Sequence, residues 1–224
     1  FTEDTEYELM MPFTSVDDGY EDRATTMYME DCARQAGLHT RWVDIEQIGV
    51  DENHRYADHE SDVIEQIFKL YPWEFMHREV FGAELPLAPT RWVEPPWKAV
   101  LSNKGLLPLL WEGWPGHENL LPSFFGSEHP DLPEPFIRKP LFSREGANIE
   151  IVGDHNDPVK SPDFGYGEEG YICQAYAPPP CFDGQYPVLG VWIVGDEARG
   201  MGIRERETVI TDDDSRFVSN VIIG

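Results

Sequence analysis

The sequence has 224 residues, with 42 acidic and 17 basic side chains and a formal net charge of -25. This charge repels nucleic-acid phosphates and anionic membranes, so we expect neither as a partner. The chain is 41% hydrophobic, enough for a core, yet it has no apolar run of about 20 residues that would cross a bilayer. Its three cysteines (Cys32, Cys173 and Cys181) form no CxxC pair, which favours reduced thiols and a cytoplasmic location.

The first ninety residues alternate strand-like and helix-like patterns. They predict, in order, a strand over Leu9 to Phe13, a helix over Arg23 to Ala36, a strand over Thr40 to Ile45, a polar hairpin over 51 to 62, a strand over Val63 to Tyr71 and a short helix from Pro72. Strands that alternate with a helix in this way are typical of a parallel sheet. Because strand-like sequence begins almost at Phe1, without an initiator methionine, we expect a piece of a longer protein.

The character of the chain changes after a proline-rich stretch. Residues Leu85 to Pro96 predict irregular structure and a boundary near residue 90. Beyond it, Trp97 to Trp111 predicts a helix with an apolar stripe, weakened by Gly105 and Pro108. The rest is mostly β, with predicted strands over Phe136 to Lys139, Asn148 to Val152, Tyr171 to Tyr176, Val188 to Val194 and Met201 to Arg204.

One polar turn between two predicted strands has the composition of a phosphate-binding loop. It follows Lys139 and contains Ser143, Arg144, Glu145, Gly146, Ala147 and Asn148. Glycine permits a close backbone approach, and the cations and N-H groups suit nucleotide phosphates. An ordinary hairpin with a charged tip has the same composition, so the residues alone leave both interpretations open.

Other segments carry weaker signals. Lys98 and Lys104 are six residues apart and cannot share a face of a regular helix, and Lys104 is the better phosphate candidate. Arg204 can aim its donors at a carboxylate or phosphoryl group, or form a surface ion pair with Glu205. The turn Asp212 to Asp214 could bind Mg²⁺ or be only an acidic turn. The sequence has no HxH or HExxH spacing of a histidine metal site, and no Walker loop, GxGxxG or GxSxG motif.

Several long motifs occur in an order that resembles the glutathionylspermidine synthase family, especially its bacterial members without an amidase domain. They are DDGYEDRATTMYMEDCARQAGL (17-38), LYPWE (70-74), WVEPPWKAVLSNKGLLPLLWEGWPGHENLLP (92-122), IRKPLFSREGANIEI (137-151), YGEEGYICQ (166-174), FDGQYPVLGVWIV (182-194), GIRE (202-205) and SRF (215-217). The resemblance implies the C-terminal part of an α/β protein. Residues 1-89 would be part of a Rossmann-like pre-ATP-grasp domain, and 90-224 an ATP-grasp fold of two α+β subdomains.

The same resemblance implies an ATP-dependent ligase that joins a polyamine amine to a peptide or glutathione-like carboxylate through an acyl-phosphate. Lys104 and Lys139 would bind the nucleotide, Gln174 would lie on the adenine side, and Arg204 would steady the transferring phosphoryl group. The loop from Ser143 to Asn148, with Arg144, Gly146 and Ala147, would fold over the phosphates. Phosphoryl transfer needs such positioned positive charge rather than a covalent protein group.

One departure from the family is the absence of its EYNAD-type stretch with the Mg²⁺ ligands. We therefore expect ATP and Mg²⁺ as cofactors, with the metal ligands outside this chain. The chain would then be a fragment of a complete enzyme, depend on a partner chain, or be a catalytically silent nucleotide- or polyamine-binding scaffold. A carbohydrate-stacking surface is a weaker alternative, because Trp73, Trp97 and Trp111 fall where core aromatic residues are expected.

Overall fold

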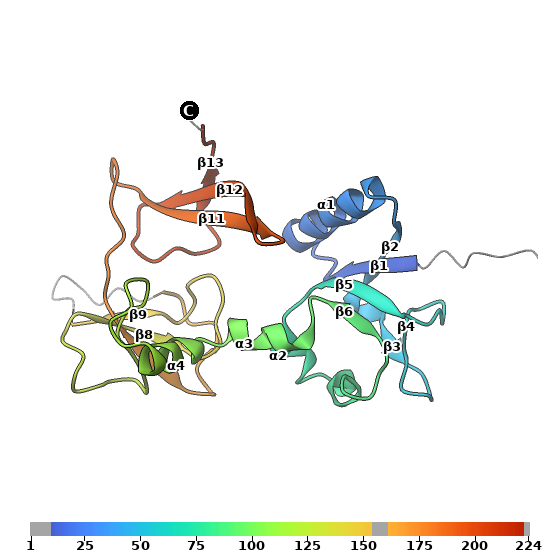
Figure 1. Ribbon diagram of the computed structural model, residues 1–224, viewed down its shortest axis with the longest axis horizontal. Coiled ribbons are helices and arrows are strands. Elements are labelled where there is room, and N and C mark those ends of the chain that lie inside the picture. Colours follow the sequence, from blue (N-terminus) through green and yellow to red (C-terminus); the bar gives the residue numbers. More distant parts are fainter. Residues whose placement is uncertain (1–9, 154–160, 222–224) are drawn as a thin grey trace, which may run out of the picture. The chain divides into compact units, whose positions relative to one another are not determined.

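The structure, a computed structural model, describes residues 10–153 and 161–221 (Figure 1). The chain folds into two compact units, Phe1–Val100 and Leu101–Gly224. The first contains a parallel sheet and a helix, and the second is mostly antiparallel, so the expected mixed α/β class is confirmed. The division near residue 90 falls inside the first unit, and the assignment of 1-89 and 90-224 to two family domains stays a prediction. No helix in the described ranges is long and apolar enough to cross a membrane.

A four-stranded parallel sheet forms the centre of the first unit, in the order β2-β1-β5-β6. Its strands are β1 (Met10–Ser15), β2 (His39–Asp44), β5 (Gln66–Leu70) and β6 (Arg91–Val93). The first three match predicted strands with shifted ends, although Leu9 lies outside the described residues. The strand order reverses between β1 and β5, and ligands of open α/β sheets bind beyond the carboxyl ends of strands at such a point.

Helix α1 (Glu21–Gln35) packs against β1 and β2 and begins two residues before the predicted start. The carboxylate of Asp18 explains this start, because it accepts hydrogen bonds from the first free backbone N-H groups of the helix, including those of Glu21 and Asp22. The backbone N-H of Tyr20, followed by that of Asp22, lowers the pKa of Asp18. The guanidinium carbon of Arg23 lies 3.8 Å from the ring centroid of Trp42 and joins the helix to the sheet.

Short elements complete the first unit. They are η1 (Ile45–Gln47), β3 (Gly49–Val50), β4 (Tyr56–Ala57), α2 (Trp73–Met76), η2 (Val80–Glu84) and η3 (Pro96–Lys98). Strands β3 and β4 form a hairpin that begins two residues before the one predicted over 51 to 62, and Pro72 is the N-cap of α2. The core consists of Tyr56, Ile64, Ile67, Trp73, Met76 and Trp92.

Two expectations about residues 85 to 111 are wrong. The stretch that was expected to be irregular contains β6, which pairs with β5 and places Trp92 in the core. The expected single helix is broken into η3, α3 (Ala99–Ser102) and α4 (Leu106–Gly113). As a result Trp97, which was expected in the core, is more than half exposed, and so are Val100 and Leu101 of the expected apolar stripe.

The second unit contains two antiparallel sheets. One has the order β7-β10-β8-β9 and the other the order β11-β12-β13. The strands are β7 (Ser123–Phe125), β8 (Phe136–Pro140), β9 (Glu150–Val152), β10 (Tyr171–Ala175), β11 (Tyr186–Val194), β12 (Glu197–Arg206) and β13 (Arg216–Val218). Strands β7 and β13 were not predicted, and β12 begins earlier than the predicted Met201.

Candidate functional site

A directed chain of hydrogen bonds crosses the first sheet of the second unit, from β8 through β10 to β7. Lys139 Nζ donates to Gln174 Oε1 at 2.8 Å, and Gln174 Nε2 donates to Ser123 Oγ at 2.9 Å. Ser123 Oγ in turn donates to the carbonyl oxygen of Leu121 at 2.9 Å. Because each group donates to the next, the Gln174 oxygen is fixed toward Lys139. The predicted nucleotide residues Lys139 and Gln174 therefore contact each other.

Lys139 is a cation with little water around it. It is adjacent in the β-ladder to Ile172, which is fully buried, and Gln174 and Ser123 are also buried. Burial disfavours the charged ammonium and lowers the pKa of Lys139 below its ordinary value of 10.5. A neighbouring anion would favour the charged form and reverse this shift. An anion beside Lys139 would therefore raise this pKa again.

The break before α4 positions Lys104 against the strand that carries Lys139. The N-H of Gly105 donates to Asn103 Oδ1 at 2.8 Å, which forms a tight turn, and Gly105 is buried. The backbone N-H of Lys104 donates to the carbonyl oxygen of Leu141 at 2.8 Å, directly after β8. Its Nζ donates to both the carbonyl oxygen and Oγ of Ser143, each at 2.8 Å. Lys104 thus holds the first residue of the predicted phosphate loop.

The loop from Ser143 to Asn148 is tightly folded. Glu145, Gly146 and Asn148 all have positive φ angles, of 49°, 73° and 55°. A Cβ atom on Gly146 would lie 2.3 Å from the carbonyl oxygen of Thr211, which follows β12. Ala147 is buried, and its N-H donates to the carbonyl oxygen of Arg144 at 2.8 Å. The loop therefore packs directly against the segment after β12, while the Arg144 side chain is exposed.

The side chain of Asn148 links the end of this loop by hydrogen bonds to the segment that contains Asp163 and Phe164. Its Nδ2 donates to Asp163 Oδ1 at 2.7 Å, and its Oδ1 accepts from the N-H of Phe164 at 2.8 Å. Donation by the Gly165 N-H and then by Asn148 lowers the pKa of Asp163. Asn148 acts in this structure as a structural link, which the sequence pattern did not predict.

Arg204 lies on the other sheet of the second unit, in β12, with its guanidinium carbon 5.8 Å from the ring centroid of Phe217. The ion pair with Glu205 that the sequence left open does not form. Glu205 instead pairs with Arg216 at 3.2 Å. Two hydrogen-bonded pairs thus lie around β8: Lys104 with Ser143, and Lys139 with Gln174. Arg204 lies on the other sheet.

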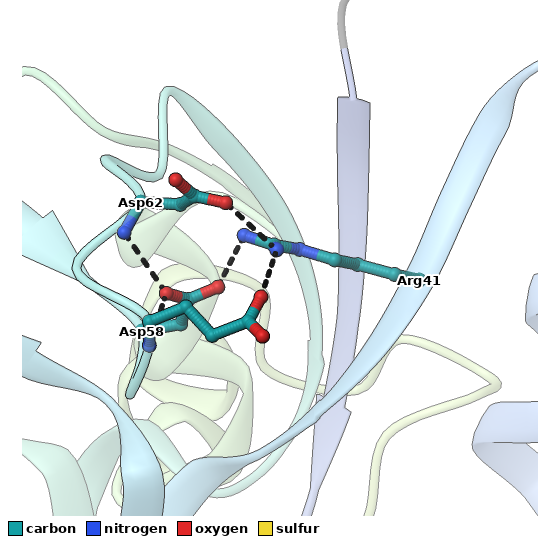
Figure 2. Close-up of polar contacts among 4 residues, drawn as sticks. Arg41, Asp58 and Asp62 are labelled. Carbon is teal, nitrogen blue, oxygen red and sulfur yellow. Dashed lines mark hydrogen bonds and ion pairs between the residues drawn. The ribbon is translucent and has the colours of Figure 1, made fainter.

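Two clusters in the described residues bring three carboxylates close enough to hold a metal ion: Asp58 with Glu60 and Asp62, and Asp212 with Asp213 and Asp214. In the first, Figure 2 shows the Arg41 guanidinium between Asp58 and Asp62, and it also pairs with Glu60. In the second, Arg206 pairs with Asp212 and Asp214. An arginine occupies the place of a cation in each cluster, so neither fits the Mg²⁺ that the resemblance implies.

Asp58 is a structural carboxylate, and Asp58→Asn should lower the free energy of unfolding by about 3 kcal/mol. Its side chain is fully buried, pairs with Arg41, and accepts from the N-H groups of Glu60 and Asp62 at 3.0 Å. Asp62→Asn is the matched control, because that side chain is 66% exposed and should contribute about 1 kcal/mol or less. Urea unfolding of both variants measures the difference, and equal effects would contradict the structural role of Asp58.

Sequence reasoning missed Ser123 and Asn103. Ser123 fixes the orientation of Gln174, and Asn103 caps the turn that positions Lys104. The Asn-Lys-Gly order is a turn signal that could have located the break, because asparagine side chains commonly bond to the backbone two residues on. No local signal could have identified Ser123, whose partner is 51 residues away.

Comparisons with known proteins find relatives that align with most of this chain. The relatives include a putative acid–amine ligase of Haemophilus influenzae, 39% identical over 92% of this chain and 54% of that protein. A trypanothione synthetase of Crithidia fasciculata is 27% identical over 91% of this chain and 35% of that protein. The bifunctional glutathionylspermidine synthetase/amidase of Escherichia coli is 25% identical over 95% of this chain and 38% of that protein.

The chain spans about half the length, or less, of these curated relatives. All three bear the names of ligases or synthetases, which supports a carbon–nitrogen ligase family at the coarse level. The family model described as glutathionylspermidine synthase preATP-grasp matches residues 1–223, a span that includes both compact units. The chain therefore belongs to the glutathionylspermidine synthase preATP-grasp family.

Proposed function

We propose that this chain contributes the nucleotide-binding part of an ATP-dependent acid–amine ligase with ATP-grasp subdomains. The ligase would join a polyamine or similar amine to a peptide or glutathione-like carboxylate. The observation that carries the proposal is the pair of lysines around β8, each fixed by a hydrogen bond. Lys139 donates to Gln174, and Lys104 donates to Ser143, the first residue of the loop.

The partial burial of Lys139 makes it suitable for phosphate. The lowered pKa of Lys139 reflects an ammonium with reduced hydration, and a poorly hydrated cation interacts strongly with an incoming anion. The loop begins at the Ser143 contact with Lys104, and its backbone N-H groups before Ala147 would be the donors to phosphate. Lys139 and the Gln174 amide would contact the nucleotide, with Gln174 toward the adenine, and the loop from Ser143 to Asn148 would cover its phosphates.

The proposed reaction has two transfers. A carboxylate oxygen of the acid attacks the γ-phosphorus of ATP, the bond to the β-phosphate bridging oxygen breaks, and ADP leaves. The amine nitrogen then attacks the acyl carbon, inorganic phosphate leaves, and the amine loses a proton. Arg204 would stabilise the charge on the transferring phosphoryl group with its planar donors. Neither carboxylate cluster described above fits Mg²⁺, so neither has a role in these two transfers.

A second candidate is a catalytically silent nucleotide- or polyamine-binding scaffold. The same carboxylate clusters favour it, since arginines neutralise both. A scaffold without metal ligands would bind ATP equally well with and without Mg²⁺. A ligase would need metal ligands from a longer protein or from a partner chain. These candidates differ in turnover and not in the nucleotide contacts proposed for Lys104 and Lys139.

Calorimetric titration with ATP tests the nucleotide contacts. Lys139→Ala should weaken ATP binding by about tenfold or more, because a charge-assisted contact with phosphate is lost. Lys98→Ala is the control, since Lys98 lies in the first unit near the Trp97 ring and has no proposed contact with ATP. Equal affinity of wild type and Lys139→Ala would contradict the proposal, and titration with and without Mg²⁺ would show whether this chain binds the metal with its nucleotide.

A further inference from the structure

A shallow trough crosses one face of the β11-β12-β13 sheet. It has a volume of about 280 Å³ and is lined by Val188, Gly190, Val191, Trp192, Gly202, Arg204 and Phe217. Gly190 and Gly202 lie directly opposite each other in the strand register. Since neither has a side chain, the centre of the trough is bare backbone, and side chains stand only around it.

Two aromatic rings flank this bare centre. A Cβ atom on Gly202 would lie 3.9 Å from Phe217 Cε1, and one on Gly200 would lie 3.7 Å from Trp192 Cδ1. Trp192 and Phe217 are 56% and 75% exposed, so both rings have surface available for contact. Aromatic side chains next to glycines offer a flat, narrow surface to a ligand that lies along the backbone.

Arg204 gives one end of the trough a positive charge. It lies opposite Val188 on β11 and Phe217 on β13. Among the residues that the structure describes, its guanidinium has no carboxylate or hydrogen-bonding partner, because the adjacent Glu205 pairs with Arg216. A guanidinium with unused donors favours a carboxylate and repels a cationic amine. The charge of the trough thus matches the acid substrate of a ligase and not the polyamine.

We propose that this trough binds the acid substrate, with its carboxylate at Arg204 and its extended chain over Gly190 and Gly202 between the aromatic rings. The inference rests on the proposed ligase function and adds the residues that determine acid specificity. The two glycines set the depth of the trough, and Trp192 and Phe217 set its width. A carboxylic acid with a flat, extended chain fits this surface, whereas a bulky chain meets the rings.

Gly202→Val tests the trough by filling its centre. The substitution should leave the fold intact, because Gly202 has no positive φ angle and a Cβ there makes only an ordinary 3.9 Å contact. Valine is also favourable in strands. Gly190→Ala is a second, smaller filling variant, whose Cβ would lie 3.8 Å from the carbonyl oxygen of Gly202. Leu189→Ala is the control, since Leu189 points to the opposite face of the sheet.

The readout is the Trp192 indole N-H resonance in an NMR titration with glutathione, assigned with Trp192→Phe. Glutathione, an extended peptide acid, should shift this resonance, and inorganic phosphate, which has no chain, should not. Gly202→Val should raise the dissociation constant for glutathione about tenfold or more, while Leu189→Ala leaves it within about twofold. Thermal unfolding midpoints within about 3 °C of wild type would show that the variants are folded.

The outcomes separate this inference from the proposed function. Loss of ATP binding in Lys139→Ala, with glutathione binding retained, together with the reverse pattern in Gly202→Val, supports both. If wild type binds ATP but glutathione leaves Trp192 unshifted, or if both filling variants bind glutathione like wild type, the trough inference is overturned and the nucleotide site stands. If glutathione shifts Trp192 but ATP does not bind, the trough binds an acid and the ligase proposal fails.

Discussion

Gly146→Val should lower ATP affinity more than about a hundredfold and the free energy of unfolding by about 3 kcal/mol. Gly146 has a φ of 73°, where a β-branched residue is strained, and its Cβ would lie 2.3 Å from the Thr211 carbonyl oxygen and 2.9 Å from Ile210 Cγ2. The Thr211 oxygen is a backbone atom, so it cannot yield unless the chain moves. The loop must then leave the segment after β12, and its N-H groups lose their positions for phosphate.

Gly165→Ala separates backbone strain from the steric clash. Gly165 also has a positive φ, 78°, yet a Cβ there would have no neighbour within 4 Å. It should therefore lose only about 1 kcal/mol of stability and keep ATP affinity within about twofold. Calorimetry with ATP and urea unfolding measure both quantities for the two variants. Wild-type ATP affinity in a folded Gly146→Val protein would show that the loop does not cover the phosphates.

The elements that sequence predicted well are those with a pattern of their own. Helix α1 has helical spacing and Asp18 before it, and β1 and β2 are strands of six residues each that contain apolar side chains. The missed strands β6, β7 and β13 have three residues each. Such short strands have no usable period, and they form because longer strands are already present to pair with them.

The broken helix before α4 shows a different limit. Gly105 and Pro108 indicated weakness, but the position of the break depends on contacts from distant residues. A Cβ on Gly105 would lie 3.0 Å from Phe125 Cε1 and 3.2 Å from Leu141 Cδ2, so the close packing at this turn favours glycine. These partners are on β7 and directly after β8. Local propensity cannot supply this information, because tertiary contacts decide where the chain turns.

In the candidate site, too, local patterns could be predicted from the sequence and long-range contacts could not. The polar composition between two strand-like runs located the loop, and its positive φ values at Glu145 and Gly146 agree with a tight turn. The link from Asn148 to Asp163 and the contact of Gly146 with Thr211 were not predictable, because each joins segments that have at least one strand between them in the sequence. Motif order identified the family, and only the structure gave each polar residue its partner.

ATP affinity should fall as pH rises above the lowered pKa of Lys139, by up to about tenfold per pH unit. Burial lowers this pKa in the free protein, whereas bound phosphate favours the ammonium and raises it. Between the free and bound pKa values, binding must therefore take up a proton. The pH dependence of folding in the absence of ligand has the opposite direction. The Lys139 ammonium loses its proton at a lower pH in the folded protein than in the unfolded chain. The cost of burying this charge therefore diminishes, and the free energy of unfolding rises, as pH rises toward 10.5.

Lys139→Arg provides the control, because a guanidinium stays charged throughout the accessible range. Calorimetry from about pH 7 to 10, in buffers with different ionisation enthalpies, measures affinity and proton uptake together. Wild type should show proton uptake that increases as pH rises above the lowered pKa of Lys139, and Lys139→Arg should show none from this position. If wild type binds ATP with constant affinity and no proton uptake, Lys139 does not contact the phosphates, and the buried ammonium serves only to orient Gln174.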